Sequence, residues 1–183
     1  MLIENSRGSE WRKYDLHMHS TASDGRATAR ELVNEAVNKG IAVIALTDHH
    51  TVDALDEAKA YGKEKGITVI SGIEFRTEYG QKSVHMIGLF PDYFKGQKLD
   101  QSALNDLILA PLDLSRTQII MKGKENHPEY SNEKAYKEGL LRVQVDFKNA
   151  ADLIHKYGGI VTVHAGGKAN SFDVEMRHEG TGV

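Results

Sequence analysis

Short apolar runs separate longer amphipathic stretches along the first half of the chain. The run IAVIAL is apolar at every position, which is typical of a strand buried on both faces of a parallel sheet. Other short runs bounded by polar residues or glycine indicate strands as well. The pattern predicts strands at residues 14–19, 41–46, 67–70 and 82–90.

Amphipathic segments between these strands predict two helices. The first begins at Thr28, which precedes Glu31 with the spacing of a capping box. The second covers about residues 52–65. Gly40 follows the first segment, where a glycine favours a left-handed cap, and Gly66 ends the second. The order strand, helix, strand, helix, strand predicts an α/β fold with parallel strands, as an open sheet or a barrel.

Residues 91–146 interrupt this alternation. The segment contains an expected helix at 101–110, followed by Pro111 and a polar run. We interpret it as an insertion on the rim of a single domain that spans residues 1–183, where long insertions often shape access to a site.

A further helix and strand follow that insertion. Asp146 is the expected cap of a helix at 147–157, and residues 160–163 (IVTV) predict a strand. The sequence predicts no core element after about residue 171, so the chain is expected to end before its fold closes.

The composition is that of a soluble globular protein, and it excludes several kinds of site. The net charge of −3 gives no general basic footprint for nucleic acid. The chain has no cysteine, so it forms neither a disulfide nor a thiolate metal site. Any metal ion must therefore be held by nitrogen and oxygen ligands.

Nothing in the sequence points to a membrane. No apolar run approaches the roughly 20 residues needed to cross a bilayer. The first residues also lack the apolar region of a signal peptide. We expect a cytoplasmic protein with no membrane partner.

The motif DLHMHSTASDG places two histidines at the end of the first strand. His17 and His19 are two residues apart, so their side chains project to the same side of a strand and can bind one metal ion. Asp24 stands beside Gly25 in the following loop, from which a carboxylate can reach back. The alternative is a pair of ordinary strand histidines and a turn aspartate.

The motif ALTDHHTVD directly follows the apolar strand at 41–46. Parallel α/β folds place their active sites at this end of their strands. Of the two adjacent histidines we expect His49 to be the ligand, with Asp48 orienting an imidazole. The alternative, capping of a helix by Thr51 or Asp53, leaves His49 unexplained.

Three further strands carry a histidine or a carboxylate. Glu74 follows an apolar run, where a carboxylate is costly unless it is paired or binds metal. It can bridge two ions, or form a salt bridge with a residue such as Arg76. His85 lies in the apolar strand VHMIGLF, where a core role is the alternative, and His164 ends the last predicted strand. Jointly these signals predict a metal site at one end of the sheet.

The motifs HMH, DG, TDH, GIE, VH and VHAGG occur in this order through most of residues 14–167. This set resembles the PHP (polymerase and histidinol phosphatase) family. The resemblance implies a distorted (β/α)7 barrel that binds two or three divalent metal ions, with Glu74 as the bridging carboxylate. It implies the metal ligands His17, His19, Asp24, His49, Glu74, His85 and His164.

Two longer stretches, RGSEWRKYDLHMHS and VDFKNAADLIHKYGGIVTVHAGGKANS, are similar to the PHP domain at the N-terminus of large AAA-like ATPases of the TrlF type. Those proteins are associated with RNA repair or phage defence. Because their PHP domain is joined to an ATPase, the similarity implies an ATPase domain or a partner chain here. The late Asp-x-His motif of the family has no counterpart after His164, because Asp173 and His178 have a different spacing. We therefore expect a barrel that is truncated at its C-terminus.

The expected activity is hydrolysis of phosphate esters by a metal-activated water, with Zn, Mn or Fe as the metal. Asp48 is the candidate catalytic residue. Arg26 and Lys168 are candidate substrate-binding residues, with solvated surface charge as the alternative. The candidate substrates are a phosphorylated small molecule and a nucleotide or nucleic-acid end.

Two other functions stay open at this point. A non-catalytic or incomplete PHP module would serve as an interaction domain for an ATPase partner or nucleic acid, and the missing Asp-x-His favours that view. A metal-dependent hydrolase of a non-phosphate bond, such as an amide, is the second, since a fold does not fix a function.

Overall fold

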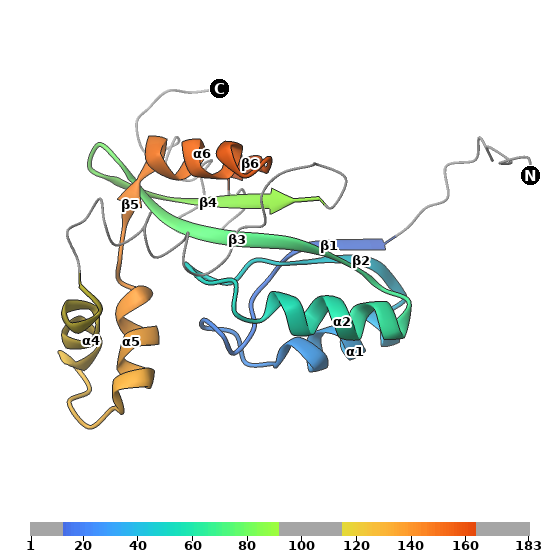
Figure 1. The fold of residues 1–183 in the computed structure, drawn as a ribbon, viewed down its shortest axis with the longest axis horizontal. Coiled ribbons are helices and arrows are strands. Elements are labelled where there is room, and N and C mark those ends of the chain that lie inside the picture. The colour runs from blue at the N-terminus through green and yellow to red at the C-terminus, as the bar shows by residue number, and fades with distance from the viewer. Residues whose placement is uncertain (1–12, 92–114, 164–183) are drawn as a thin grey trace, which may run out of the picture.

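The structure is a computed structural model that describes residues 13–91 and 115–163. Within these ranges the strands form a single mixed sheet (Figure 1). The strands are β1 (Lys13–Met18), β2 (Ile41–Leu46), β3 (Thr68–Tyr79), β4 (Lys82–Phe90), β5 (Val145–Asp146) and β6 (Ile160–Val163). Strands β1, β2, β3, β4 and β6 lie side by side in that order, and the short β5 pairs with β3.

The sheet is parallel only in its first part. Strands β1, β2 and β3 are parallel, as the alternation of strands and helices predicts. Strands β3 and β4 form an antiparallel hairpin, closed by a tight turn in which Gly80 has a φ of +63°. Strand β6 is also antiparallel to β4. The expectation of parallel strands was therefore wrong beyond β3. For β4 the reason is that a chain that turns back in a hairpin, without a crossover, can pair only antiparallel.

Strand β3 is also longer than the strand expected at residues 67–70. It runs from Thr68 to Tyr79, so that Glu74 lies inside the strand rather than beyond its end. The first residues of β3 pair with β2, while the part from Ser71 onwards pairs with β4. This length lets a single strand connect both halves of the sheet.

Helices α1 (Ala29–Asn38) and α2 (Leu55–Lys65) lie below β1, β2 and β3 in Figure 1. The predicted capping box is confirmed, since Thr28 accepts a hydrogen bond from the Glu31 backbone N–H and donates its own to the Glu31 carboxylate. The predicted left-handed cap is also confirmed, with a φ of +64° at Gly40, and Gly66 at the end of the second helix has a φ of +76°. Helix α2 begins three residues later than expected. The two helices cover a core that includes Val33, Ile44 and Leu46.

Helix α6 (Phe147–Lys156) lies above β3 and β4 in Figure 1. Its predicted cap is confirmed, because the Asp146 carboxylate accepts a hydrogen bond from the Asn149 backbone at 2.8 Å. Ile154 packs into a second core with Phe75 and other side chains of β3 and β4. Gly88 of β4 makes this close approach possible, since a Cβ there would lie only 2.7 Å from Ile154 Cγ1.

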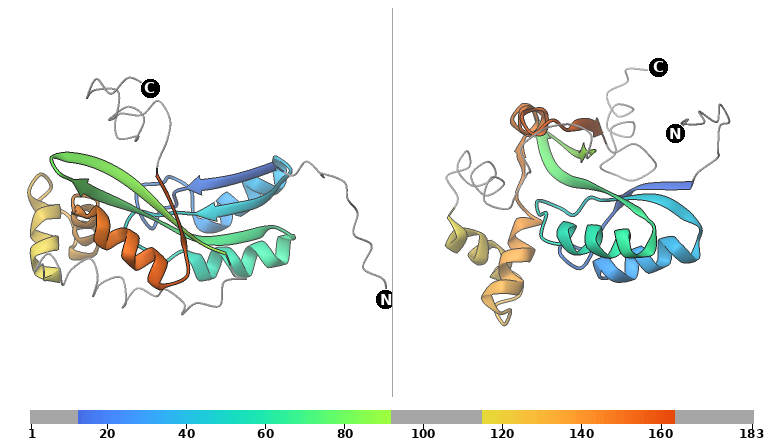
Figure 2. Two further views of the ribbon diagram at one scale, coloured as in Figure 1. Left: turned by 90° about the horizontal axis from the view of Figure 1, so that it is seen from above. Right: turned by 45° about the vertical axis from the view of Figure 1, so that its right-hand side comes forward.

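Residues 115–140 contain a helical hairpin that the sequence pattern did not predict. Its helices are α4 (Arg116–Lys124) and α5 (Asn132–Leu140). Each begins at a serine, Ser115 or Ser131, whose side chain accepts a backbone hydrogen bond from the first turn. The views of Figure 2 place the hairpin at one end of the molecule. The helix expected at 101–110 lies outside the described residues, and the interpretation of residues 91–146 as a rim insertion stays a prediction.

None of the helices in the two described ranges combines the length and the apolar character that a membrane span requires.

Replacement of Ile154 by alanine should lower the free energy of unfolding by about 2 to 5 kcal/mol, because the side chain is 0% exposed and its loss leaves a cavity. The matched control is Ile160→Ala on β6, where the side chain is 46% exposed and the loss should stay below about 1 kcal/mol. Urea denaturation of both variants measures the difference. Equal losses would contradict the packing of α6 described above.

Candidate metal centre

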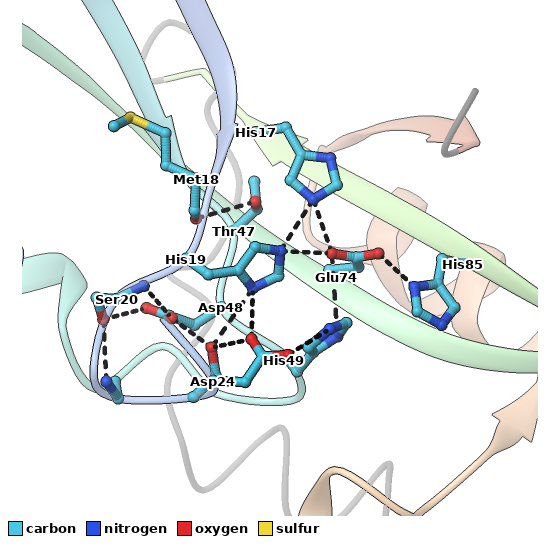
Figure 3. A network of polar contacts seen from close by, with 12 residues as sticks. His17, Met18, His19, Ser20, Asp24, Thr47, Asp48, His49, Glu74 and His85 are labelled. Atoms are coloured by element: carbon cyan, nitrogen blue, oxygen red, sulfur yellow. Dashed lines mark hydrogen bonds and ion pairs between the residues drawn. The ribbon is translucent and has the colours of Figure 1, made fainter. Parts of the chain in front are cut away.

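The functional side chains gather where β1 and β2 end and where β3 passes them (Figure 3). His17 lies on β1 and His19 just beyond its end, so both rings project to the same side, as their spacing predicts. The end of β1 is tied to the end of β2 because the Thr47 N–H donates a hydrogen bond to the Met18 carbonyl at 2.8 Å. The loop after β1 and the loop after β2, which carry the two motifs, therefore begin next to each other.

The loop after β2 is joined directly to β3 at Glu74. The Glu74 N–H donates to the Asp48 carbonyl at 3.1 Å, and the His50 N–H donates to the Glu74 carbonyl at 3.1 Å. These two bonds continue the pairing of β2 with β3 and form an isolated bridge between His49 and Glu74. The backbone thus fixes the His49 and Glu74 side chains next to each other.

The Glu74 carboxylate is the centre of the cluster. It is only 2% exposed, and its Oε2 lies 2.8 Å from both His17 Nε2 and His19 Nε2. Its Oε1 lies 2.7 Å from His85 Nδ1 on β4. Glu74 therefore interacts with imidazoles on both of its oxygens, whereas the alternative partner Arg76 lies near Asp24, with Nη2 4.0 Å from Oδ2.

These contacts control the protonation of the carboxylate. Burial by itself raises the pKa of Glu74, but hydrogen bonds from His17, His19 and His85 outweigh burial and hold the pKa well below its ordinary value. Glu74 is consequently a carboxylate at neutral pH, with two oxygens that can act as ligands.

Asp24 closes the other side of the cluster. Its Oδ1 lies 3.3 Å from His19 Nδ1, and its Oδ2 lies 3.6 Å from His49 Nε2. The loop reaches back in this way only because residue 25 is glycine. A Cβ on Gly25 would lie 2.1 Å from the His19 carbonyl oxygen.

Three groups of ligand atoms are close enough to hold a metal ion. Within each group the atoms lie within 4.8 Å of one another. The groups are His17, His19 and Glu74; His19, Asp24 and His49; and His49, Glu74 and His85.

The donors in these groups fit a metal ion. The Nε2 atoms of His17 and His19 lie 2.9 Å apart. Ligand atoms that share a metal ion at about 2.0 to 2.1 Å lie about 2.8 to 3.5 Å from one another. His49 Nδ1 is buried without a hydrogen-bond partner among the described residues. A buried polar nitrogen in that state is costly, and a bound cation would satisfy it.

The surroundings shift the pKa values of His49 and His19 in opposite directions. Burial lowers the pKa of His49 to about 4, so its ring is neutral and can donate a lone pair at neutral pH. Burial likewise lowers the pKa of His19, but the hydrogen bond and charge of Glu74 raise it above its ordinary value. A proton on His19 would therefore compete with a metal ion at low pH.

Comparison with known sequences identifies the family. The sequence profile of the PHP domain matches residues 15–174. The chain belongs to the PHP domain family. An uncharacterised protein of Methanocaldococcus jannaschii is 30% identical over 164 residues, which make up 80% of this chain and 85% of that protein.

Two relatives whose names state an activity match a shorter part of the chain. A 5′-3′ exoribonuclease of Haemophilus influenzae is 47% identical over 78 residues, 43% of this chain and 28% of that protein. A 3′,5′-nucleoside bisphosphate phosphatase of Chromobacterium violaceum is 40% identical over 75 residues, 41% of this chain and 26% of that protein. The chain thus matches little more than a quarter of the length of each.

Solved structures show the same fold. An amidohydrolase from Chromobacterium violaceum, with bound sulfate, superposes with a TM-score of 0.62 at 22% identity and covers 85% of this chain and 68% of its own. A protein from Bifidobacterium adolescentis, assigned as a metal-dependent phosphoesterase, has a TM-score of 0.59 at 18% identity and covers 94% and 75%. At these identities the likeness concerns the fold alone.

The Asp48 carboxylate contacts the loop that follows β1. Its Oδ1 accepts hydrogen bonds from the Ser20 N–H at 2.7 Å and the Ser23 hydroxyl at 2.5 Å, and its Oδ2 accepts from the Ser20 hydroxyl at 2.7 Å. Its link to an imidazole is indirect, since the Ser23 hydroxyl lies 3.4 Å from His19 Nδ1. The two serines were missed by the sequence analysis, although their position inside the DLHMHSTASDG motif was a signal.

The remaining candidate residues are exposed or lie beyond the described ranges. Arg26 is exposed in the loop between β1 and α1. His164 and Lys168 lie outside the described residues. His50, the neighbour of His49, is turned into the interior, with its ring centroid 5.8 Å from that of Phe75 and its Nε2 accepting a 3.3 Å hydrogen bond from the Arg76 N–H.

Replacement of Glu74 by glutamine should remove at least half of the bound divalent ions, because Glu74 belongs to two of the three ligand groups. The matched control is Glu78→Gln, an exposed carboxylate on the same strand, which should leave metal content unchanged. Elemental analysis after incubation with Mn²⁺ or Zn²⁺ measures the content. Equal metal content in both variants and the wild type would contradict the assignment.

The metal-free protein should lose stability as the pH falls from 7 to 5. Burial lowers the pKa of His50 to about 3, so the unfolded chain binds a proton in this range that the folded chain does not. The contribution of His50 is about 2 kcal/mol over these two pH units. His50→Asn should reduce the slope, because asparagine does not titrate and tolerates the φ of +54° at this position.

Denaturation with urea in EDTA at several pH values measures this slope. The exposed His155→Asn on α6 is the control and should keep the wild-type slope. An unchanged slope in His50→Asn would contradict a buried neutral His50.

Proposed function

We propose that this PHP domain is a metal-dependent phosphoesterase. The observation that carries the proposal is the buried Glu74 carboxylate, with Oε2 facing His17 and His19 and Oε1 facing His85. A carboxylate that offers each oxygen to a different set of imidazoles is suited to bridge two cations. The phosphatase and exoribonuclease names of two relatives support the same reaction class.

The sharing of ligands sets how many ions the described residues can hold. The first group (His17, His19, Glu74) and the last group (His49, Glu74, His85) share only Glu74, so both can be filled at once. The middle group shares His19 with one and His49 with the other. We propose two ions here, and a third where His164 or other residues outside the described ranges contribute. Nitrogen and oxygen donors suit Zn²⁺, Mn²⁺ or Fe²⁺.

Divalent ions bound here would supply a water nucleophile at neutral pH and neutralise charge on the phosphate. The residues of the chain contribute orientation and charge. Glu74 and Asp24 bring two negative charges to the site, and their oxygens lie beside the imidazoles of the cluster. Asp48, expected to be catalytic, is proposed instead as a positioning residue that acts on His19 through Ser23. Arg26 and Lys168 stay proposals for phosphate binding.

The proposed substrates are nucleotides or RNA ends. This follows the names of the relatives, which act on nucleoside bisphosphates and RNA. A non-catalytic interaction module is not favoured, because the described ligand set of six residues is brought together. An amide substrate has no support from these functionally named relatives.

Two finer assignments stay proposals. The first is a closed barrel. Within the described ranges β1 pairs only with β2, so the sheet has an open edge there. A close relationship to the PHP domain of TrlF-type ATPases is the other, with an ATPase domain or partner chain, and it rests on the two sequence stretches around His17 and His164.

Turnover of p-nitrophenyl phosphate and bis(p-nitrophenyl) phosphate tests the proposal and separates monoesters from diesters. The wild type with Mn²⁺ should hydrolyse one of them, and Glu74→Gln should lower the rate at least about 100-fold because ion binding is lost. Glu78→Gln should retain the wild-type rate. A wild type that binds metal but turns over neither ester nor a nucleotide would overturn the proposal.

A further inference from the structure

The α4–α5 hairpin forms one wall of a pocket that reaches the metal cluster. The pocket has a volume of about 160 Å³, and His49 and Ser23 line it on the side of the cluster. It is also lined by Arg116 from the start of α4 and by Tyr136 and Lys137 from α5. A ligand whose phosphate lies at the cluster would therefore extend toward this hairpin.

Arg116 is held as a flat platform in this wall. Its guanidinium carbon lies 4.0 Å from the centroid of the Tyr136 ring, and the Tyr136 ring is half-buried. Arg116 is exposed, and its backbone is placed by Ser115, which caps the helix that begins at Arg116. A guanidinium that stacks on an aromatic ring can accept a second planar group, such as a nucleobase, on its other face.

The charges around the pocket argue against a second phosphate in this place. Arg116 and Lys137 are balanced by Asp53 and Glu133, which line the same pocket. A phosphate would face two carboxylates, whereas a neutral base can hydrogen-bond with acidic and basic groups alike. Leu140 and Leu141 add an apolar part to the lining, which suits a ring rather than an anion.

We propose that this pocket binds the base of a nucleotide, stacked on Arg116, while the phosphate lies at the Glu74 cluster. The proposal rests on the proposed phosphoesterase function and adds the residue that selects a nucleotide over a simple phosphate ester. The α4–α5 hairpin is then the specificity element of the site.

Binding of adenosine and of ribose to the Mn²⁺-supplied chain tests the stacking without any turnover, because neither carries a phosphate. Calorimetry should show adenosine binding about tenfold more tightly than ribose, the scale of one base stack. Arg116→Ala and Arg116→Lys should both lose this difference, since lysine keeps the charge but not the plane. Lys134→Ala is the matched control, because Lys134 stacks on Tyr130 at 3.8 Å in the same hairpin but is not part of the pocket lining.

If Arg116→Ala or Arg116→Lys still binds adenosine more tightly than ribose by the wild-type factor, base stacking on Arg116 is overturned. Hydrolysis of adenosine 5′-monophosphate and ribose 5-phosphate is measured on the same samples. The ratio of their kcat/KM values should fall about tenfold in both Arg116 variants. If neither ester is hydrolysed but adenosine still binds more tightly than ribose, the proposed function alone is contradicted. If both are hydrolysed and the Arg116 variants leave the ratio of kcat/KM values unchanged, the base pocket alone is contradicted.

Discussion

The fold depends on a carboxylate that is buried among imidazoles. Glu74 is 2% exposed, and such a charge is very costly in a protein interior unless partners compensate it. The partners come from β1, from the loop after β2 and from β4, so the strands must lie in the observed order for Glu74 to be tolerated. The long β3 is what makes this possible, because it pairs with β2 and β4 at the same time.

Much of this arrangement could be predicted from local sequence. Thr28 and Glu31 predicted a helix start because a capping box depends on neighbours three residues apart, and the spacing of His17 and His19 predicted rings on one side. The antiparallel turn at Gly80 was missed because the residue pattern of a strand does not show whether it pairs parallel or antiparallel with its neighbour. The α4–α5 hairpin was missed because the sequence of α4, RTQIIMKGK, lacks a clear apolar stripe.

The candidate metal ligands could be predicted from the sequence, but the residues that hold them in place could not. Histidines and carboxylates at strand ends are visible as motifs, whereas the hydrogen bonds of Asp48 to Ser20 and Ser23 depend on how two loops meet. The same holds for Arg116, which is an ordinary exposed cation in sequence and gains meaning only from its position over Tyr136 beside the cluster. In the proposed function, the residues that would bind the reacting phosphate and the residue that would select the substrate come from separate parts of the chain.

The most direct test of the account is anomalous diffraction from crystals grown with Mn²⁺. We expect two anomalous peaks at the cluster, one beside His17, His19 and Glu74 and the other beside Glu74 and His85. A single peak bound away from Glu74, or none at saturating Mn²⁺, would contradict the bridging role on which the proposed activity depends.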